Sequence, residues 1–227
     1  MFSLGRGYVA ACLSNVLPMT RISPAMWLEW AREIQALAQT GLHFAEDDYQ
    51  VQRYRRLTEI AAEIVSESSL LSYESIVRIY NSQIGYATPR VDVRGAMFQD
   101  GKLLMVKERL DGGWTMPGGW ADVGDVPSEA AEREVWEEAG FRVKVKRVVG
   151  IYDANRVGPL ELFHAFKIVF LCEHLGGVAR TSHETSDVGF FGPDEIPECL
   201  SGERTTSQQI ADAFAFLLDP DRITVFD

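Results

Sequence analysis

The sequence has few cysteines, a deficit of positive charge and no long apolar run, and each absence excludes a class of protein. Its three cysteines are odd in number and none stands in a CxxC spacing, which argues against a disulfide framework or a zinc site and fits a reducing cytoplasm. Acidic residues number 33 against 22 lysines and arginines, and this net charge of −11 disfavours general binding of nucleic acid or anionic membranes. No apolar run is long enough to span a bilayer.

What the chain does contain is enough apolar material for a core. Hydrophobic residues make up 46% of its 227 residues, which indicates a folded chain of one large or two small domains. We divide it into residues 1–22, expected to be a poorly ordered tail, residues 23–85, a helical segment, and residues 88–227, an α/β domain. An initiator at Met19 or Met26 is an alternative account of the first part.

The segment over residues 23–85 has the pattern of three short amphipathic helices. Ser23 and Pro24 suit the start of the first, and apolar residues recur at helical spacing as far as Gly41, its expected end. Two more helices are expected over about residues 46–65 and 71–82. Because such short helices cannot bury all their apolar stripes alone, we expect them to pack on one another, on the next domain or on a second subunit. A homodimer formed through this segment is the preferred hypothesis.

The rest of the chain has the pattern of a mixed sheet with helices on its faces. The expected strands cover residues 91–98, 102–106, 143–152, 160–172 and 183–191. Residues 100–101 are a strong hairpin signal, and residues 176–177 are expected to turn the chain. His164 is expected to lie in the core, and Thr206 and Gln209 form a potential capping box for a last helix.

The most informative stretch is a glycine loop that runs into a helix. Pro127 suits the first turn of this helix, and Gly140 suits the left-handed residue just past its end. Glu134, Glu137 and Glu138 stand at i, i+3 and i+4, so their carboxylates share one face. Three like charges near a helix C-terminus repel one another and oppose the helix dipole, so local stability does not explain them. A hard divalent cation such as Mg²⁺ does.

This stretch resembles the Nudix box, G-x5-E-x7-R-E-U-x-E-E-x-G-U, in which U is apolar. The matching residues are Gly119, Arg133, Glu134, Val135, Glu137, Glu138, Gly140 and Phe141. Asp125 stands where the family usually has glutamate, and this shorter acid could bind the helix start or reach a metal through water. The helix that begins near Trp27 resembles an extension found on a Nudix subgroup that acts on nucleoside diphosphates linked to another moiety, including ADP-ribose and CDP-choline.

The resemblance implies a fold, a reaction and a metal. The fold is an α/β/α sandwich with a mixed sheet, here preceded by the all-α segment. The reaction is metal-dependent hydrolysis of the diphosphate in a small-molecule substrate such as ADP-ribose or CDP-choline, giving a nucleoside monophosphate and phospho-X. The metal is Mg²⁺, with Mn²⁺ as an alternative, and its expected ligands are Glu134, Glu137, Glu138 and the backbone carbonyl of Gly119.

Catalysis also needs a group that takes a proton from the attacking water. The candidates are Glu137, Glu138 and the loop residue Glu184, for which a surface acid is the alternative interpretation. Arg133 lies four residues before Glu137 and is expected to orient a carboxylate.

Three further residues are candidates for substrate binding. Arg94 can reach a phosphate or form a salt bridge, and Trp120 in the glycine loop can stack on a base. Arg156 follows a strand and enters a loop, where binding residues often lie.

Two other functions compete with the hydrolase. A Nudix-like regulatory domain that senses a nucleotide would often lack box glutamates, and this chain keeps those of the helix. A hydrolase acting on RNA ends is disfavoured by the acidic balance of the chain.

Overall fold

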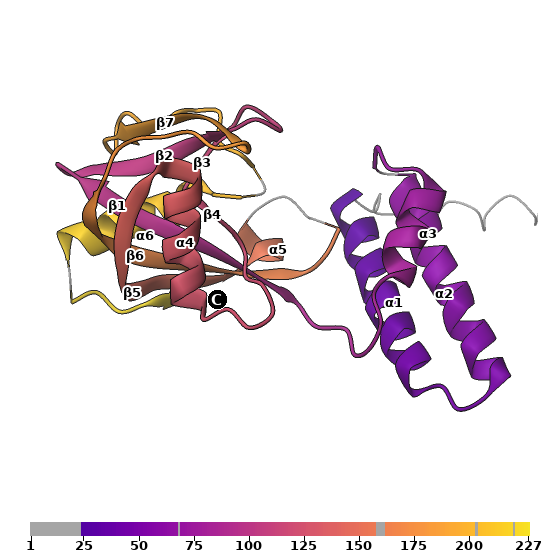
Figure 1. Cartoon of the computed structure of the whole chain (residues 1–227). Helices are drawn as coiled ribbons and strands as arrows, with labels where there is room; N and C mark the ends of the chain where they lie inside the picture. Colours follow the sequence, from indigo (N-terminus) through magenta and orange to yellow (C-terminus); the bar gives the residue numbers. More distant parts are fainter. Residues whose placement is uncertain (1–23, 68, 158–161, 203, 220) are drawn as a thin grey trace, which may run out of the picture.

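The computed structural model describes residues 24–67, 69–157, 162–202, 204–219 and 221–227. Its first three helices lie to one side of an α/β part, as Figure 1 shows. The tail expected over residues 1–22 and the start of the first helix at Ser23 lie outside the described residues.

The helical part contains α1 (Pro24–Phe44), α2 (Asp48–Ser66) and α3 (Tyr73–Asn81). Side chains cap the second and third helices, since Asp47 accepts from the backbone N–H of Gln50 and Ser72 from that of Ser75. The three helices share a core of small and apolar side chains. Its buried members are Ala31, Ala61, Ala62, Val65, Ile76 and Tyr80.

Gly41 does not end the first helix, so this prediction was wrong: α1 continues to Phe44. The reason lies in the packing of α1 on α2. A Cβ atom at Gly41 would overlap the Tyr54 ring, so the glycine allows the two helices to approach closely. A glycine near a helix end predicts a cap only where the chain needs a left-handed residue, and here it serves the helix–helix contact instead.

The sheet has eight strands. They are β1 (Arg90–Gln99), β2 (Lys102–Glu108), β3 (Trp114–Thr115), β4 (Gly118–Trp120), β5 (Phe141–Asp153), β6 (Ala165–Gly177), β7 (Thr185–Phe191) and β8 (Val225–Phe226). The order is β3-β2-β1-β6-β5-β8, with β4 paired to β1 and β7 to β2. The β1–β6 and β5–β8 pairs are parallel and the other strand pairs antiparallel, so the mixed sheet is confirmed.

The hairpin between β1 and β2 is confirmed, because Asp100 and Gly101 both have positive φ, 52° and 77°, as a type I′ turn requires. Two other predictions were wrong. Residues 176–177 do not turn the chain, since Gly176 pairs with Arg142 and β6 runs through both glycines. His164 precedes β6 and is only partly buried, with its Nε2 3.1 Å from Asp153 Oδ1.

Helices cover both faces of the sheet (Figure 1). On one face α4 (Pro127–Ala139) packs its Ala131 and Val135 against Val93 and Met97 of β1. On the other face α6 (Ser207–Leu218) closes a second core cluster and begins with the predicted capping box of Thr206 and Gln209. A short helix, α5 (Ala154–Val157), follows β5. The predicted α/β/α sandwich is therefore confirmed.

The structure also shows the surroundings of two cysteines and the character of the helices. Cys172 is buried and Cys199 exposed, and both are free thiols, whereas Cys12 lies outside the described residues. In the part of the chain that the structure describes, no helix combines the length and apolar character needed to cross a membrane.

Replacing Gly41 by alanine is expected to lower the free energy of unfolding by about 1–2 kcal/mol. Crowding against the Tyr54 ring should outweigh the roughly 1 kcal/mol that alanine adds to helix stability. Urea denaturation followed by circular dichroism measures the change. In a Tyr54→Ala background the crowding is absent, so there the same substitution should stabilise. A single Gly41→Ala variant more stable than the parent protein would contradict the close contact.

Candidate active site

A cleft of about 1070 Å³ lies beside the box helix α4. It is lined by side chains and backbone from several elements: Asp92 and Arg94 of β1, Gly118, Gly119 and Trp120 of β4, Arg133, Glu134, Glu137 and Glu138 of α4, and Lys167 of β6. Three loops complete it: one with Leu110 and Asp111, one with Arg180, Ser182, His183 and Glu184, and one with Ser201, Gly202 and Arg204. The cleft thus gathers six carboxylates and five lysine or arginine side chains in one place.

The position of α4 explains how its carboxylates reach this cleft. The helix runs from Pro127 to Ala139, and Gly140 caps its end with a φ of 78°, the left-handed value that the sequence predicted. A Cβ atom at Gly95 of β1 would overlap the Val135 side chain, so the helix lies unusually close to the strand. Val135 therefore faces the sheet, while the neighbouring positions of Glu134 and Glu138 turn toward β4 and the cleft.

Glu138 is the most buried of the box carboxylates, with 5% of its surface exposed. Its Oε2 accepts a hydrogen bond of 2.9 Å from the backbone N–H of Gly118. Burial raises the pKa of Glu138 to about 7, against the opposing effects of Arg94 and of the Gly118 hydrogen bond. This carboxyl can therefore exchange a proton near neutral pH, or bind a cation as a carboxylate.

Arg133 holds the other box acids together. Its Nη1 lies 2.9 Å from Glu134 Oε1 and 3.6 Å from Glu137 Oε2, and its Nη2 donates to Asp125 Oδ2 at 2.9 Å. Burial raises the pKa of Glu134, and Arg133 opposes that shift. Asp125, whose role the sequence left open, also accepts from the backbone N–H of Asp122 at 3.1 Å. It is thus a partner of Arg133 at the start of the helix.

Arg94 lies in the floor of the cleft and is 2% exposed. Its Nε and Nη2 donate to the two carboxylate oxygens of Asp92 at 2.8 and 2.7 Å, the bidentate geometry of a strong charged pair. Burial by itself would lower the pKa of Arg94, but the Asp92 carboxylate raises it above its ordinary value. Of the two roles predicted for Arg94, a salt bridge is the one observed in the structure.

The remaining predicted residues divide between the cleft and the outside. Glu184 and Trp120 both line the cleft, and Trp120 also borders a second cavity toward α1. The Glu184 carboxylate is exposed and lies 3.1 Å from His183 Nε2. The backbone of Gly119 runs beside Glu134, since a Cβ atom there would lie 3.3 Å from Glu134 Oε2. Arg156 instead borders a separate cavity of about 240 Å³.

The donors available for a cation are all oxygens: three box carboxylates and the main-chain carbonyl of Gly119. This chemistry fits a hard divalent cation. Among the described residues, no three acidic, histidine or cysteine side chains stand together as a ready-made cation site. Glu134 and Glu137 instead face Arg133, and Glu138 accepts from Gly118, so these contacts hold the acids in the cleft.

Several cleft residues were missed by sequence reasoning. Asp92 and Lys167 are opposite one another in the parallel β1–β6 pair, with Lys167 Nζ 3.6 Å from Asp92 Oδ2. Glu108 is buried beside the cleft and pairs with Arg204 at 3.2 Å, while its Oε1 has no hydrogen-bond partner among the described residues. Burial raises the pKa of Glu108. No local motif marks these residues, because strand register brings Asp92 and Lys167 together and Glu108 meets Arg204 of a distant loop.

Both parts of the chain match known protein families. Residues 25–80 match the family Nudix_N, described as a UDP-X-like, N-terminal oligomerisation domain, and residues 88–212 match the NUDIX domain. A protein of Bacillus subtilis (strain 168), named "Putative ADP-ribose pyrophosphatase YjhB", is 37% identical over 202 residues, which cover 88% of this chain and 97% of that protein. An ADP-ribose pyrophosphatase of Methanocaldococcus jannaschii is 31% identical over 50% of this chain and 68% of its own length.

Solved structures agree with these sequence matches. A crystal structure of a UDP-X diphosphatase is 30% identical, with a TM-score of 0.58, and the match covers 91% of this chain and all of that one. An ADP-ribose pyrophosphatase from Streptococcus suis 89-1591 is 38% identical, with a TM-score of 0.57, over 62% of this chain and all of that one. As the box residues predicted, the chain belongs to the Nudix hydrolase family and carries the N-terminal domain of its UDP-X-like members.

Proposed function

We propose that the chain hydrolyses the diphosphate of a nucleoside diphosphate linked to another moiety, of the ADP-ribose or UDP-X type. The products are a nucleoside monophosphate and phospho-X. The observation that carries this proposal is the set of box carboxylates gathered along a single cleft of about 1070 Å³, large enough for such a compound. Relatives named as ADP-ribose pyrophosphatase and UDP-X diphosphatase support the substrate class.

The proposed cofactor is Mg²⁺, with Mn²⁺ as the alternative, in a family that generally uses a divalent metal. Glu134, Glu137, Glu138 and the carbonyl of Gly119 would hold it. When bound, the cation neutralises phosphate charge and lowers the pKa of a water molecule. The three carboxylates along α4 support this assignment, because a diphosphate placed beside them would otherwise meet like charge.

The side chains of the chain supply the remaining functions. Arg133 is the positioning residue, because its contacts fix Glu134 and Glu137 from one side. Glu138 or Glu184 takes the proton of the attacking water: the first is buried with a raised pKa, and the second stands exposed on the loop at the cleft. Trp120 offers a half-exposed ring on which the base can stack. Arg156 lies outside this proposed site.

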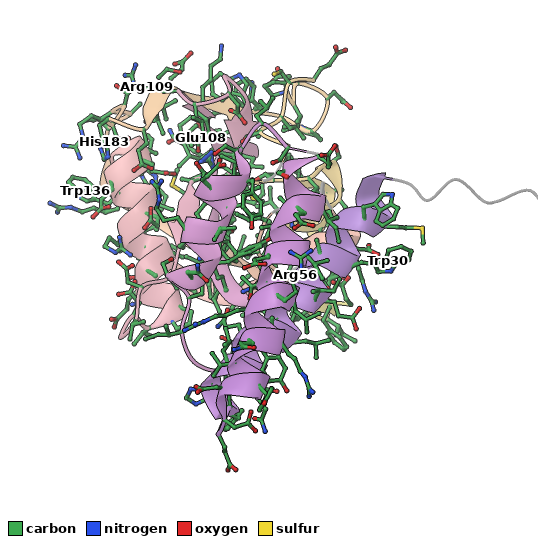
Figure 2. The ribbon with its side chains drawn as sticks, turned by 90° about the vertical axis from the view of Figure 1, so that its right-hand side faces the viewer. Trp30, Arg56, Glu108, Arg109, Trp136 and His183 are labelled. Carbon is green, nitrogen blue, oxygen red and sulfur yellow. The ribbon has the colours of Figure 1, made fainter. Side chains whose placement is uncertain are left out.

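The helical part is proposed to form a homodimer. Its family is described as an oligomerisation domain, and α1 exposes a row of large apolar side chains. These are Met26, Trp27, Trp30, Leu37 and Phe44. Figure 2 shows Trp30 on the outer side of α1. Its ring packs edge-on against that of Trp27, with 5.3 Å between the ring centroids. An exposed apolar face of this kind is typical of a protein–protein contact.

Replacing Glu138 by glutamine is expected to lower kcat by about 10²-fold or more, because the amide neither binds a cation as well nor takes a proton. The assay measures nucleoside monophosphate released from ADP-ribose, UDP-sugars and CDP-choline with Mg²⁺. Glu129→Gln, an exposed acid on the same helix, is the matched control and should keep wild-type turnover. Tight nucleotide binding without turnover by the wild type would favour the sensor, and turnover of a short RNA alone would favour an RNA-end hydrolase.

Replacing Asp125 by asparagine is expected to raise the Mg²⁺ concentration for half-maximal activity by about tenfold. The change weakens the pair with Arg133, and residues that orient metal ligands typically have effects of this size. A titration of activity against Mg²⁺ provides the measurement. Asp125→Glu restores the acid usual in the family and should behave as the wild type. An unchanged Mg²⁺ requirement in Asp125→Asn would show that Asp125 does not act through Arg133.

Replacing Trp30 by glutamate is expected to convert a dimer to a monomer, because it places a charge in the apolar face of α1. Light scattering at a fixed protein concentration measures the mass. Leu70→Glu introduces the same charge at a fully exposed position between α2 and α3 and should leave the dimer intact. A monomeric wild type would end this hypothesis.

A further inference from the structure

Most of the cations that line the cleft are committed to acids. Arg94 and Lys167 face Asp92, Arg133 faces its three acids, and Arg204 pairs with Glu108. Arg180 differs from all of them. It lines the same cleft, is exposed, and makes no ion pair with a carboxylate anywhere in the described ranges. It is therefore the cleft cation whose charge is most available to an anionic ligand.

The position of Arg180 is fixed in two ways. Its backbone N–H donates to the carbonyl of Ala139 at 3.0 Å, which ties this loop to the C-terminal end of α4. Its guanidinium lies over the ring of Trp136, 5.0 Å from the centroid, and the guanidinium of Arg142 lies over the same ring at 5.2 Å. In Figure 2, Trp136 and His183 lie at the same edge of the molecule, beside α4.

A cation–π contact of this kind leaves a guanidinium able to bind phosphate. A cation–π contact with one ring leaves several of the five N–H donors of a guanidinium available, and these donors match the geometry of a phosphate. An arginine held in this way also loses less conformational freedom when it binds, since its side chain is already placed. Trp136 is 37% exposed, at the variable position of the box, so this ring serves the surface beside the cleft rather than the core.

The order of residues along α4 indicates which part of a substrate would reach Arg180. The backbone of β4 runs antiparallel to the helix, since Gly118 meets Glu138 and Gly119 lies beside Glu134. The next residue, Trp120, therefore continues toward the start of the helix, whereas Arg180 contacts its end at Ala139. A base stacked on Trp120 and a diphosphate placed along the box acids would direct the far phosphate toward Arg180.

We propose that Arg180 is a substrate-binding residue that contacts the phosphate on the X side of the scissile bond, and that Trp136 is the positioning residue for its guanidinium. This inference rests on the proposed function and deepens it, because it assigns opposite ends of the cleft to the base and to phospho-X.

The test compares steady-state kinetics of variants on the compound that the wild type hydrolyses best. Arg180→Ala is expected to raise KM about tenfold and to change kcat by less than about threefold, because a lost charged hydrogen bond to the substrate weakens ground state and transition state alike. Trp136→Ala should raise KM in the same direction, and Trp136→Phe, which keeps an aromatic face, should restore it. Arg142→Ala is the matched control: it removes the other guanidinium on Trp136, does not line the cleft, and should leave KM within about twofold.

The two proposals can fail separately. A wild type that turns over a substrate, with Arg180→Ala at an unchanged KM, overturns the role of Arg180 and leaves the hydrolase standing. A wild type without turnover overturns the hydrolase, and calorimetry with inorganic pyrophosphate and Mg²⁺ then decides on Arg180. In that case about tenfold weaker binding by Arg180→Ala supports the inference, while equal binding, or none by the wild type, overturns it. If circular dichroism shows the alanine variant unfolded, Arg180→Gln takes its place in both arms.

Discussion

The close approach of α4 to β1 sets the positions of the two least exposed box acids, Glu134 and Glu138. At Gly95 the strand has no side chain, and Val135 fills the space that a Cβ atom would need. Because the helix is held against the sheet there, Glu134 and Glu138 are turned toward β4. A larger residue at Gly95 would push the helix away and separate Glu138 from the Gly118 backbone that it accepts from. The chemistry of the cleft thus depends on one small residue in the core.

Most acidic side chains in the cleft lie close to a basic side chain. Beneath the surface, Arg94 and Lys167 surround Asp92, so the floor of the cleft carries buried charge that is paired. At the helix, Arg133 compensates part of the repulsion among the box acids, and Asp125 shares that arginine. Glu184 and Arg180 lie on the neighbouring loop. Glu184 contacts His183, and Arg180 contacts the ring of Trp136. The acid excess that destabilises an isolated helix becomes useful where a cation and a polyanionic substrate meet.

How much of this could be predicted depends on whether the signal is local. The box acids, Pro127, Gly140 and the hairpin at residues 100–101 were predictable, because each depends on spacing within a few residues. Gly41 was misread because its neighbour, Tyr54, lies on another helix. The strand through residues 176–177 was misread because pairing with β5 overrides the local preference of two glycines to turn.

The cleft shows the same limit. Asp92 and Lys167 are 75 positions apart and face each other only through the register of β1 and β6, which no sequence pattern reveals. Arg180 lines the cleft through the contact of its loop with the end of α4, and the exposure of Trp136 beside it is seen only in the structure. Sequence reasoning therefore identified the acids of the reaction better than the cations around them.

The central claim is that this cleft hydrolyses a diphosphate between a nucleoside and a second moiety. The most direct measurement is ³¹P NMR of ADP-ribose, and of a UDP-linked compound, incubated with the protein and Mg²⁺. We expect the diphosphate signals to disappear and two monoester signals to grow in equal amounts, one from the nucleoside monophosphate and one from phospho-X. Unchanged diphosphate signals in every compound, or release of inorganic pyrophosphate, would contradict it.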